Sequence, residues 1–453
     1  MKISFQQNQK KQQEIPKRSK EFHSTKDSID HNRFDWMTTY KVSKPRKILK
    51  YIEKDQEGSQ ENRQMYTQNE STANGICRKS IQYYKDLYKK AEGKQPTSSL
   101  TNQESVFAIK EFKRNEFTSK RGKRMVKYDL TICDNTGSLS LSIFSDSLDR
   151  IFSKEIEIEG IDGILSNWQE RPFLHMFFDV SSNDYSSEGF SFDITEAEFV
   201  DFDQVNINEL LETPKSLSDS TDLIEMYEKL HKEAEQIKDP VYRKITVFLL
   251  ENNREGYLYM PAAKSVHEEN VGGLLEHTLR VLEFCKGFAV YPEDPINTDL
   301  LYSGAILHDI GKLVEFDPSQ NGLVEAYSAA GNLMGHLHIG ASIVEKAYAA
   351  CIERNGIDDF GIARTEENDE KIACLCHLIL SHHKEPEFGA VVQPKILEAV
   401  LLHEADTVDA TIKGYEKAYK NTKPGRIADN RSFFLGNVFV YRPSDVCDDK
   451  LKK

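Results

Sequence analysis

The amino-acid sequence predicts a multidomain protein in which a basic, polar arm is followed by a small all-β domain and then by an all-α domain. Three observations support this fold class. Short runs of alternating apolar residues recur between residues 105 and 180, as is typical of strands. Longer apolar segments with helical spacing fill much of residues 256–440. The first hundred residues are poor in aliphatic side chains, which is typical of a disordered segment.

Composition limits the function classes that need to be considered. The chain has 453 residues, enough for two or three domains, and a net charge of −14, so it is not a general polyanion binder. No apolar run approaches the roughly 20 residues that span a bilayer, and no apolar segment of a secretory signal follows Met1. The seven cysteines show no C-x-x-C spacing. We therefore expect a cytoplasmic protein with free thiols and no membrane partner.

The N-terminal extension has its own charge balance. The first fifty residues carry 13 Lys/Arg and 5 Asp/Glu, a local net charge of +8, which leaves about −22 for the remainder. Either this arm is simply disordered, or it helps to hold RNA or a partner. A short helix is expected over residues 80–90. We divide the chain into an extension (1–100), a β domain (101–200), a helical linker (201–255), the all-α domain (256–440) and a tail (441–453).

The β domain reads as five short strands with one helix after the third. Strands are expected at residues 106–109, 126–133, 139–143, 156–161 and 173–180, and the helix at 147–152. Residues 134–137, Asp-Asn-Thr-Gly, are a turn signal between the second and third strands. This order of elements predicts a small Greek-key barrel of the OB type.

The loop between the first two strands is the most basic part of this domain. Six of the twelve residues from 113 to 124 are basic, namely Lys113, Arg114, Lys120, Arg121, Lys123 and Arg124. In OB folds this region binds oligonucleotides, although a basic hairpin tip by itself is often only solvated. Four aromatic residues are available for base stacking, and we expect most of them to lie in the core: Phe107, Tyr128, Phe144 and Trp168.

The all-α domain contains most of the histidines. Helices are expected at residues 271–288, 299–308, 337–351, 371–383 and 394–419, with a turn at 331–335 and a loop at 355–369. Nine of the 13 histidines fall between positions 267 and 403. The pair His308-Asp309 ends an apolar helix, where two polar side chains need partners or a metal. The spacing of these residues is too wide for a zinc finger but suits an interior site of a helical bundle.

Imidazole and carboxylate ligands together suit Mn, Fe, Co, Ni or Zn. No P-loop and no Ser-His-Asp or Cys-His arrangement is evident in the sequence. The chemistry that a divalent ion best supports here is hydrolysis of a phosphodiester, because a bound ion lowers the pKa of its water.

The order H…HD…H…HH…D, with His-Asp-Ile-Gly-Lys at residues 308–312, resembles that of the HD-domain metal-dependent phosphohydrolases over about 267–410. The chain is more closely similar to one branch, the YhaM-type 3′→5′ exoribonucleases, over about 105–440. The matching stretches are PAAK at 261–264, GGLLEHT at 272–278, GNLMGH at 331–336, SHH at 381–383, LHEADTVDA at 402–410 and NRSF at 430–433. That branch also carries an N-terminal OB domain.

The resemblance implies a role for individual residues. His277, His308, Asp309 and Asp406 would form one metal site, and Asp309 would bridge to a second ion held by His336, His382 and also, as a further candidate, His383. Lys312 would neutralise charge on the phosphate; the alternative is a lysine that caps the preceding helix. His267 and Arg431 are further candidates for contact with the substrate, although His267 is equally well read as a helix cap. His338, His377 and His403 are expected to be structural, and Asp409 to be a surface carboxylate or one that holds a metal ligand.

Three functions compete at this point. The leading reading is a metal-dependent 3′→5′ exoribonuclease with two divalent ions, Mn above Co, Fe, Ni or Zn, whose OB domain holds single-stranded RNA. An HD phosphohydrolase of a small nucleotide (a dNTP, an alarmone or a cyclic dinucleotide) is the first rival. An RNA-binding adaptor with a structural metal is the second. The sequence is compatible with single-stranded DNA as a further substrate. It is also compatible with either a monomer or an oligomer.

Overall fold

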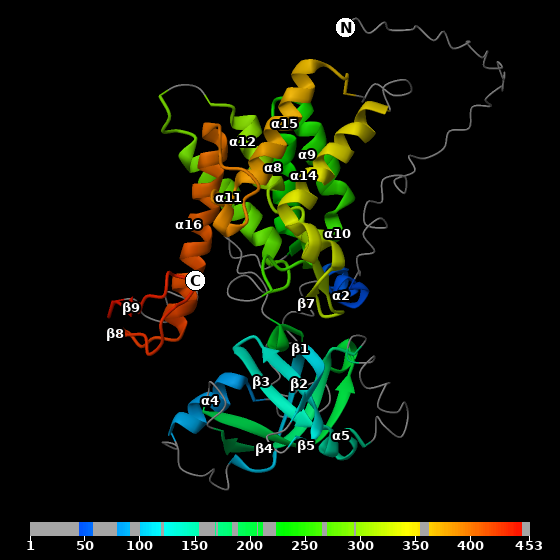
Figure 1. The fold of residues 1–453 in the computed structure, drawn as a ribbon, viewed down its shortest axis with the longest axis vertical. Coiled ribbons are helices and arrows are strands. Elements are labelled where there is room, and N and C mark those ends of the chain that lie inside the picture. The colour runs from blue at the N-terminus through cyan, green and yellow to red at the C-terminus, as the bar shows by residue number, and fades with distance from the viewer. Residues whose placement is uncertain are drawn as a thin grey trace, which may run out of the picture. The chain divides into compact units, whose positions relative to one another are not determined.

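A computed structural model describes residues 45–57, 79–90, 100–118, 122–153, 168, 171–183, 189–205, 207–211, 223–264, 270–293, 296–353 and 362–445 (Figure 1). They form an antiparallel sheet with two short flanking helices, and a helical domain. None of the helices in these ranges is both long enough and apolar enough to cross a membrane. The five cysteines in these ranges are free thiols.

Five strands form the sheet in the order β3-β2-β1-β4-β5, with every neighbouring pair antiparallel. Asp134 organises the predicted turn between two of them, because its Oδ1 accepts hydrogen bonds from Thr136 N at 2.8 Å and Gly137 N at 3.2 Å. The strands are β1 (Gln103–Thr118), β2 (Arg124–Asp134), β3 (Gly137–Phe144), β4 (Phe173–Ser182) and β5 (Phe190–Val200).

One face of the sheet forms an aromatic core. Phe178 and Phe192 stack with centroids 4.1 Å apart, and Tyr84 packs edge-on against both rings at 5.3 and 5.1 Å. Tyr84 belongs to α4 (Ile81–Lys90), the helix expected at residues 80–90. The helix α5 (Ser145–Ile151) buries Leu148 and Ile151 against the same core. Burial of these large apolar side chains is what holds the two helices to the sheet.

Four of the predicted strands and the helix after the third are confirmed. The strand expected at residues 156–161 lies outside the described ranges, and β5 was not predicted although Phe190, Phe192 and Ile194 alternate along it and are buried. The edge strands β3 and β5 do not pair with each other among the described residues, and α5 lies against both. The described strands therefore form an open sheet rather than the closed barrel that the sequence predicted.

The helical domain is centred on α12 (Thr298–Leu307), which packs most extensively against five other helices. Its sequence is apolar on all sides, as expected of a helix surrounded by others. Gly304 is needed there because a Cβ at that position would lie 2.4 Å from Leu378 Cδ2 of α15. The five neighbours are α8 (Leu223–Glu235), α9 (Pro240–Asn252), α11 (Gly273–Phe288), α15 (Glu366–Ser381) and α16 (Leu397–Lys420).

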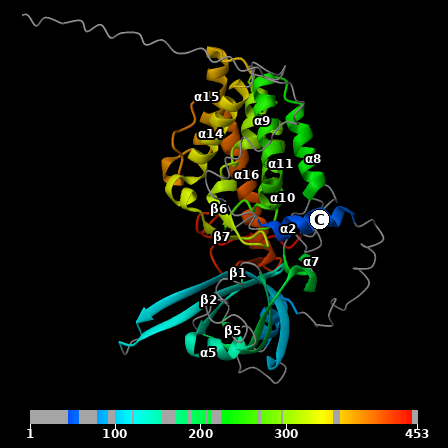
Figure 2. The same ribbon diagram turned by 90° about the vertical axis from the view of Figure 1, so that its right-hand side faces the viewer.

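Shorter elements complete the described part of the chain. They are α2 (Arg46–Glu57), η3 (Phe202–Gln204), α7 (Ile207–Leu210), α10 (Arg254–Tyr259), α13 (Lys312–Glu315), β6 (Phe316–Pro318), β7 (Val324–Tyr327), η4 (Pro386–Phe388), β8 (Arg426–Ile427) and β9 (Tyr441–Arg442). Figure 2 labels α2, α7, α10, β6 and β7 among them. The helix α2 falls in the segment expected to be a disordered arm, and it buries Ile48, Leu49 and Ile52.

Two boundaries differ from the prediction. The glycine-rich residues 331–335 were read as a turn, but they belong to α14 (Ala329–Glu353), which kinks at Gly335, where φ is 68° and ψ is 157°. Glycine adopts this conformation without the strain that a Cβ would introduce, so the kink sits directly before His336. The predicted loop 355–369 also ends earlier than expected, because Thr365 caps α15 by accepting a hydrogen bond from Asn368 N.

Candidate metal centre

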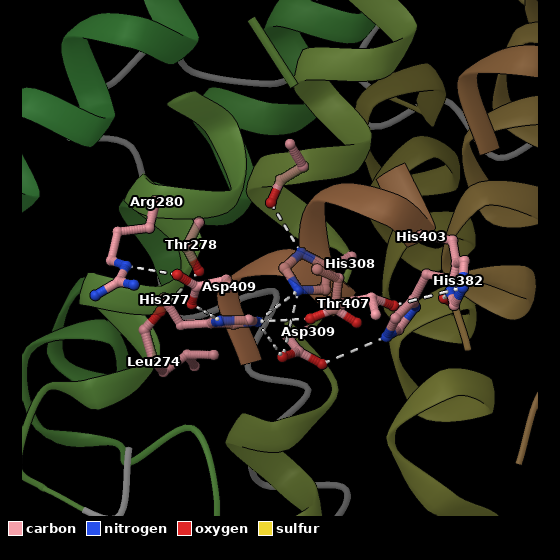
Figure 3. A network of polar contacts seen from close by, with 12 residues as sticks. Leu274, His277, Thr278, Arg280, His308, Asp309, His382, His403, Thr407 and Asp409 are labelled. Atoms are coloured by element: carbon pink, nitrogen blue, oxygen red, sulfur yellow. Dashed lines mark hydrogen bonds and ion pairs between the residues drawn. The ribbon is translucent and has the colours of Figure 1, made fainter. Parts of the chain in front are cut away.

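Two helices and the end of a third bring imidazoles and carboxylates close together (Figure 3). His277 of α11 places its Nε2 3.1 Å from His308 Nε2 at the end of α12, 3.4 Å from Asp309 Oδ2 and 3.2 Å from Asp406 Oδ1 of α16. The ligand atoms of His277, His308 and Asp406 all lie within 4.8 Å of one another. These residues, together with Asp309, are the ones for which the family resemblance implied a first metal site.

A second grouping lies beside the first. His336 Nε2 and His382 Nε2 approach the other oxygen of Asp309, Oδ1, at 3.5 and 3.7 Å. His336, His382 and His383 also form a triad whose ligand atoms lie within 4.8 Å of one another. Asp309 therefore turns one oxygen toward each group, which is the geometry that a bridging carboxylate requires.

The five histidines share one hydrogen-bonding pattern. Each ring engages its Nδ1 with an oxygen: Asp409 Oδ2 for His277, Ala305 O for His308, Glu315 Oε1 for His336, Ile379 O for His382 and Phe388 O for His383. A carbonyl oxygen accepts only, so Nδ1 carries the proton where the partner is a carbonyl. The neutral ring then has its lone pair on Nε2, which is the arrangement of a metal-ligating histidine.

Buried polar atoms that lack hydrogen-bond partners show that the residues of the two groupings fit a cation. Asp309 Oδ1, His336 Nε2 and His382 Nε2 are buried and have no hydrogen-bond partner among the described residues. Burying such atoms unpaired costs about 1–3 kcal/mol each. His277 Nε2 and His308 Nε2 face each other at 3.1 Å. A cation among these atoms would remove the penalties together, and the donor set of imidazoles and carboxylates suits a divalent transition metal.

Burial and neighbouring charges set the protonation states of the centre. Burial lowers the pKa of His382 well below its ordinary value, and the nearby His383 and His308 lower it further. Burial raises the pKa of Asp309, but Lys312 and His308 outweigh it, so that pKa lies well below its usual range. Burial likewise lowers the pKa of Lys312, yet Asp309 more than offsets this and the pKa is raised. The carboxylate is thus ionised, His382 is neutral and the lysine is protonated near neutral pH.

Lys312 lies inside the centre rather than on the surface. Its Nζ is 2.6 Å from Asp309 Oδ2, and the side chain is 16% exposed. The residue begins α13, one turn after Asp309. This position differs from that of a solvated lysine that caps the end of α12.

Two carboxylates behind the ligands complete the site. Asp409, which the sequence left open as a surface or supporting residue, is fully buried and accepts from His277 Nδ1 at 2.8 Å and from Arg280 Nε at 2.5 Å. Glu315 was not predicted; it accepts from the backbone N and from Nδ1 of His336, both at 3.0 Å. An acidic residue between Val314 and Phe316, inside an apolar run that follows the His-Asp motif, was the available signal for it.

Replacing Asp409 by Asn tests this support. Arg280 would hold the amide oxygen, leaving the NH₂ to face His277 Nδ1 and favouring the tautomer with its proton on Nε2. We expect about 10- to 100-fold weaker metal affinity, as is typical for loss of such a partner. Competition with a fluorescent chelator measures this affinity, with Glu404→Gln on the exposed side of α16 as the matched control. Affinity within twofold of the parent would show that Asp409 does not set the His277 tautomer.

The other predicted histidines lie at the edges of the centre or outside the described ranges. His403 Nδ1 contacts the carbonyl oxygen of His382 at 2.6 Å, and His377 Nε2 accepts from Lys395 N at 2.9 Å. His338 is exposed. The structural roles expected of these three histidines stay predictions, and His267 lies outside the residues that the structure describes.

The prediction of a loop over residues 113–124 was largely wrong, because residues 113–118 belong to β1 and pair with β2 as far as Thr118 and Arg124 in a long hairpin (Figure 2). Two of its cations are offset locally: Lys113 pairs with Glu111, and Arg114 with Glu116 at 2.7 Å. Lys123 and Arg124 are exposed, and Lys120 and Arg121 lie outside the described residues. Of the four stacking candidates, Phe144 is 46% exposed while Phe107, Tyr128 and Trp168 are buried, as expected for most of them.

Comparison with known proteins agrees with the geometry. Residues 274–411 match the model of the HD domain, and this range contains every residue of both groupings. The chain is 34% identical over 244 residues to the 3'-5' exoribonuclease YhaM of Listeria welshimeri, covering 53% of this chain and 70% of the relative. The chain belongs to the YhaM family. It is also 34% identical to YhaM of Bacillus subtilis and of Geobacillus sp., each over 244 residues, 53% of this chain and 69% and 67% of the relatives.

Membership of the YhaM family, together with the HD domain, makes the chain a metal-dependent hydrolase. No solved structure matches it. The HD domain implies binding of a divalent metal, and the matched range contains the buried side chains of His277, His308, Asp309 and His382.

Proposed function

We propose that this YhaM-family chain is an exoribonuclease that removes nucleotides from the 3′ end of single-stranded RNA, and that it works in the cytoplasm. The observation that carries the proposal is that four imidazoles place their Nε2 atoms 3.4 to 3.7 Å from the Asp309 carboxylate, with Lys312 beside it: His277, His308, His336 and His382. The chain's relatives are named 3'-5' exoribonucleases. Imidazole and carboxylate ligands at this position suit hydrolysis of a phosphodiester.

Two divalent ions are proposed for the centre, with Mn²⁺ as the preferred metal. His277, His308, Asp309 and Asp406 would hold one, and Asp309, His336, His382 and His383 would hold the other. Support for two comes from the distances: different Asp309 oxygens face the two groups, Oδ2 toward His277 and Oδ1 toward His336. A bound ion of this kind lowers the pKa of water and offsets the negative charge of a phosphate.

The protein's own side chains bind and orient the scissile phosphate. Lys312, held 2.6 Å from Asp309 Oδ2, would donate an N–H to a phosphate oxygen and offset charge there. Asp409 and Glu315 would keep the lone pairs of His277 and His336 directed at the centre. The rings of His308 and His382 are nearly fully buried, which limits competing access of water from their side.

The β domain would hold the strand upstream of the 3′ end. The exposed Lys123 and Arg124 at the end of the β1–β2 hairpin, with Lys120 and Arg121 next to them in sequence, form the most basic part of that domain. The exposed Phe144 ring of β3 lies 6.4 Å from the Phe117 ring of β1, so two aromatic side chains lie close together from strands on either side of β2. Aromatic rings beside cations are the usual means by which single strands are bound.

A charge-removal variant tests this hairpin. Changing Lys120, Arg121, Lys123 and Arg124 together to Ala is expected to weaken binding of a 20-nucleotide RNA and to flatten its salt dependence by about 0.7 per lost phosphate contact. Changing Lys113 and Arg114 instead should have a smaller effect, because Glu111 and Glu116 already offset their charges. Fluorescence anisotropy over a salt series measures both the RNA affinity and its salt dependence for each variant. Equal affinity and salt slope in the quadruple variant and the parent would remove the hairpin from the strand path.

One assay tests the function. Metal-free protein, restored with Mn²⁺, is mixed with a 5′-labelled oligoribonucleotide, and the products are resolved by length. A ladder that shortens from the 3′ end, and that disappears when a chelator is added, is the expected result. Cleavage of mononucleotides alone would favour a hydrolase of small nucleotides. Binding of RNA without turnover under any divalent ion would favour an RNA-binding adaptor. The same assay on a single-stranded DNA of the same sequence shows whether the enzyme prefers ribose or deoxyribose.

A further inference from the structure

The segment that follows α16 exposes an unusual number of aromatic side chains. We call residues 421–445 the C-terminal lobe; it contains the β8–β9 pair and follows the end of α16 (Figure 1). Phe433 is 90% exposed, Phe439 50% and Tyr441 53%. Exposed aromatic side chains gathered in one short segment mark an interaction surface more often than a solvated loop.

This lobe is anchored to the helix rather than loosely attached. Arg442 is 1% exposed, and its Nη1 donates to Tyr419 O at 2.9 Å and to Thr422 O at 3.0 Å, so it satisfies carbonyls at the C-terminal end of α16. A Cβ on Gly414 would lie 2.8 Å from side-chain atoms of both Phe434 and Leu435. The lobe is thus packed closely on α16, and the exposed rings are presented by an ordered scaffold.

The contact at Gly414 lies near the metal centre along the helix. Gly414 follows the metal-site residue Asp406 by eight positions on α16. At 1.5 Å and about 100° per residue, this is about 12 Å along the axis and about 80° around it. The lobe therefore meets α16 about two turns from the centre, within reach of a strand whose 3′ end occupies that centre.

Charge identifies the kind of partner. The C-terminal lobe carries four Lys/Arg and two Asp, a net charge of +2, within a chain whose net charge is −14. Lys423 and Arg426 are exposed and form no ion pair with a carboxylate in the described part of the chain. The Arg431 guanidinium lies 4.7 Å above the Phe439 ring, while its Nη1 donates to Asn437 O at 3.1 Å. A second copy of this chain would bring the same positive charge to the surface, whereas a polyanion complements it.

We propose that the C-terminal lobe is a second binding surface for the single-stranded RNA substrate. Bases upstream of the 3′ end stack on Phe433 and Phe439, and Arg426 and Arg431 contact the phosphates between them. Stacking on rings interleaved with cations binds single strands with little sequence preference. This proposal rests on the proposed function, since it assigns the path of the same polymer whose 3′ end is hydrolysed.

Phe433→Ala is the sharpest test, because a side chain 90% exposed contributes little to the fold. Binding of a 5′-fluorescein-labelled 20-nucleotide RNA is measured by anisotropy in the Asp309→Asn background, so that hydrolysis does not consume the ligand. We expect about tenfold weaker binding, the loss typical of one base–aromatic stack. Tyr291→Ala, which removes an aromatic side chain 80% exposed in another loop, is the matched control and should leave affinity unchanged.

Variants of Arg431 separate the contribution of charge to RNA binding from that of base stacking. Arg431→Gln should lower the salt slope of binding by about 0.7, the value for one phosphate contact on a single strand, and Arg431→Lys should restore most of that slope. With an active chain, Phe433→Ala should raise the KM for the 20-nucleotide RNA and leave kcat/KM for bis(p-nitrophenyl) phosphate within twofold, because that small ester does not reach the lobe.

Four outcomes decide the proposal. RNA affinity within twofold of the parent in Phe433→Ala overturns it. So does a change of molecular mass in sedimentation without a change of RNA affinity, which would identify a surface between copies of the chain. If the parent binds RNA through Phe433 but shortens no RNA, the lobe stands and the proposed nuclease activity fails. If the parent shortens RNA and Phe433→Ala behaves identically, the lobe alone is rejected.

Discussion

Replacing Asp309 by Asn is expected to lower kcat on a single-stranded oligoribonucleotide by at least about 10³-fold, roughly 4 kcal/mol of activation barrier. Asp309 is the residue nearest to both groupings: His277 and His308 lie 3.4 Å from its Oδ2, while His336 lies 3.5 Å from its Oδ1. The amide of Asn keeps the shape of the side chain but loses the charge and replaces one acceptor with a donor. A donor aimed at imidazole lone pairs would occupy the position that a cation needs.

Three measurements check this expectation. Single-turnover kinetics with Mn²⁺ give the rate, elemental analysis gives the metal bound per chain, and far-UV circular dichroism reports whether the helical domain is kept. Asp149→Asn, an exposed carboxylate on α5, is the control for the same chemical change away from the centre. The expected pattern is a large loss of rate and of bound metal at Asp309 with normal helicity. Full activity of Asp309→Asn after chelation and Mn²⁺ restoration would falsify the bridging role.

The candidate ligand residues were predicted from the resemblance to the HD-domain phosphohydrolases, and the chemistry of the residues themselves supplied a second, local signal. His308-Asp309 ends an apolar helix, where charge-capable side chains are costly unless they share a function. His277, His336 and His382 each occur within or at the end of an apolar helix, so a pattern of polar residues in buried segments was visible. The structure brings the nitrogen atoms of these rings together although they lie up to 105 positions apart in the sequence.

The supporting residues could not be assigned in the same way, because their roles depend on tertiary contacts. Asp409 is one helical turn from Asp406, and the sequence cannot say which of the two carboxylates faces His277 Nε2 and which faces Nδ1. Arg280 reads as a surface residue of an amphipathic helix until α16 places Asp409 2.5 Å from its Nε. The orientation of each imidazole is set by such contacts, and these are fixed only when α11, α12 and α16 pack.

The β domain illustrates a different limit. Alternating apolar residues identified β1 to β4, since residues on one face of a strand recur with period two. Pairing is a separate question: β1 pairs with both β2 and β4, whereas β3 and β5 occupy the two edges. Closure of a barrel depends on strand tilt and stagger, which are properties of the assembled sheet and not of a single strand's pattern. The element order alone therefore predicted a closed barrel where the described strands form an open sheet.

Lys312→Gln is expected to lower kcat by about 100-fold while the bound metal stays within twofold of the parent. A protonated lysine has no lone pair for a metal, so its removal costs the centre no ligand. Its ammonium, 2.6 Å from Asp309 Oδ2 and 16% exposed, is instead positioned to meet a phosphate that enters the centre. Loss of one well-placed group of this kind typically costs about 2.7–4 kcal/mol of transition-state stabilisation.

Two comparisons separate this role from a purely structural one. Lys312→Arg keeps the positive charge and should retain more activity than Lys312→Gln, whereas a lysine that only supported the packing of α13 would show no such order. Lys229→Gln removes a half-exposed lysine of α8 that pairs with Glu283 at 3.6 Å, and it should leave kcat unchanged. Elemental analysis and kcat on the oligoribonucleotide are measured for all three variants. If Lys312→Gln stays within about threefold of the parent, under 1 kcal/mol of barrier, the phosphate charge must be offset by the metals or by another residue.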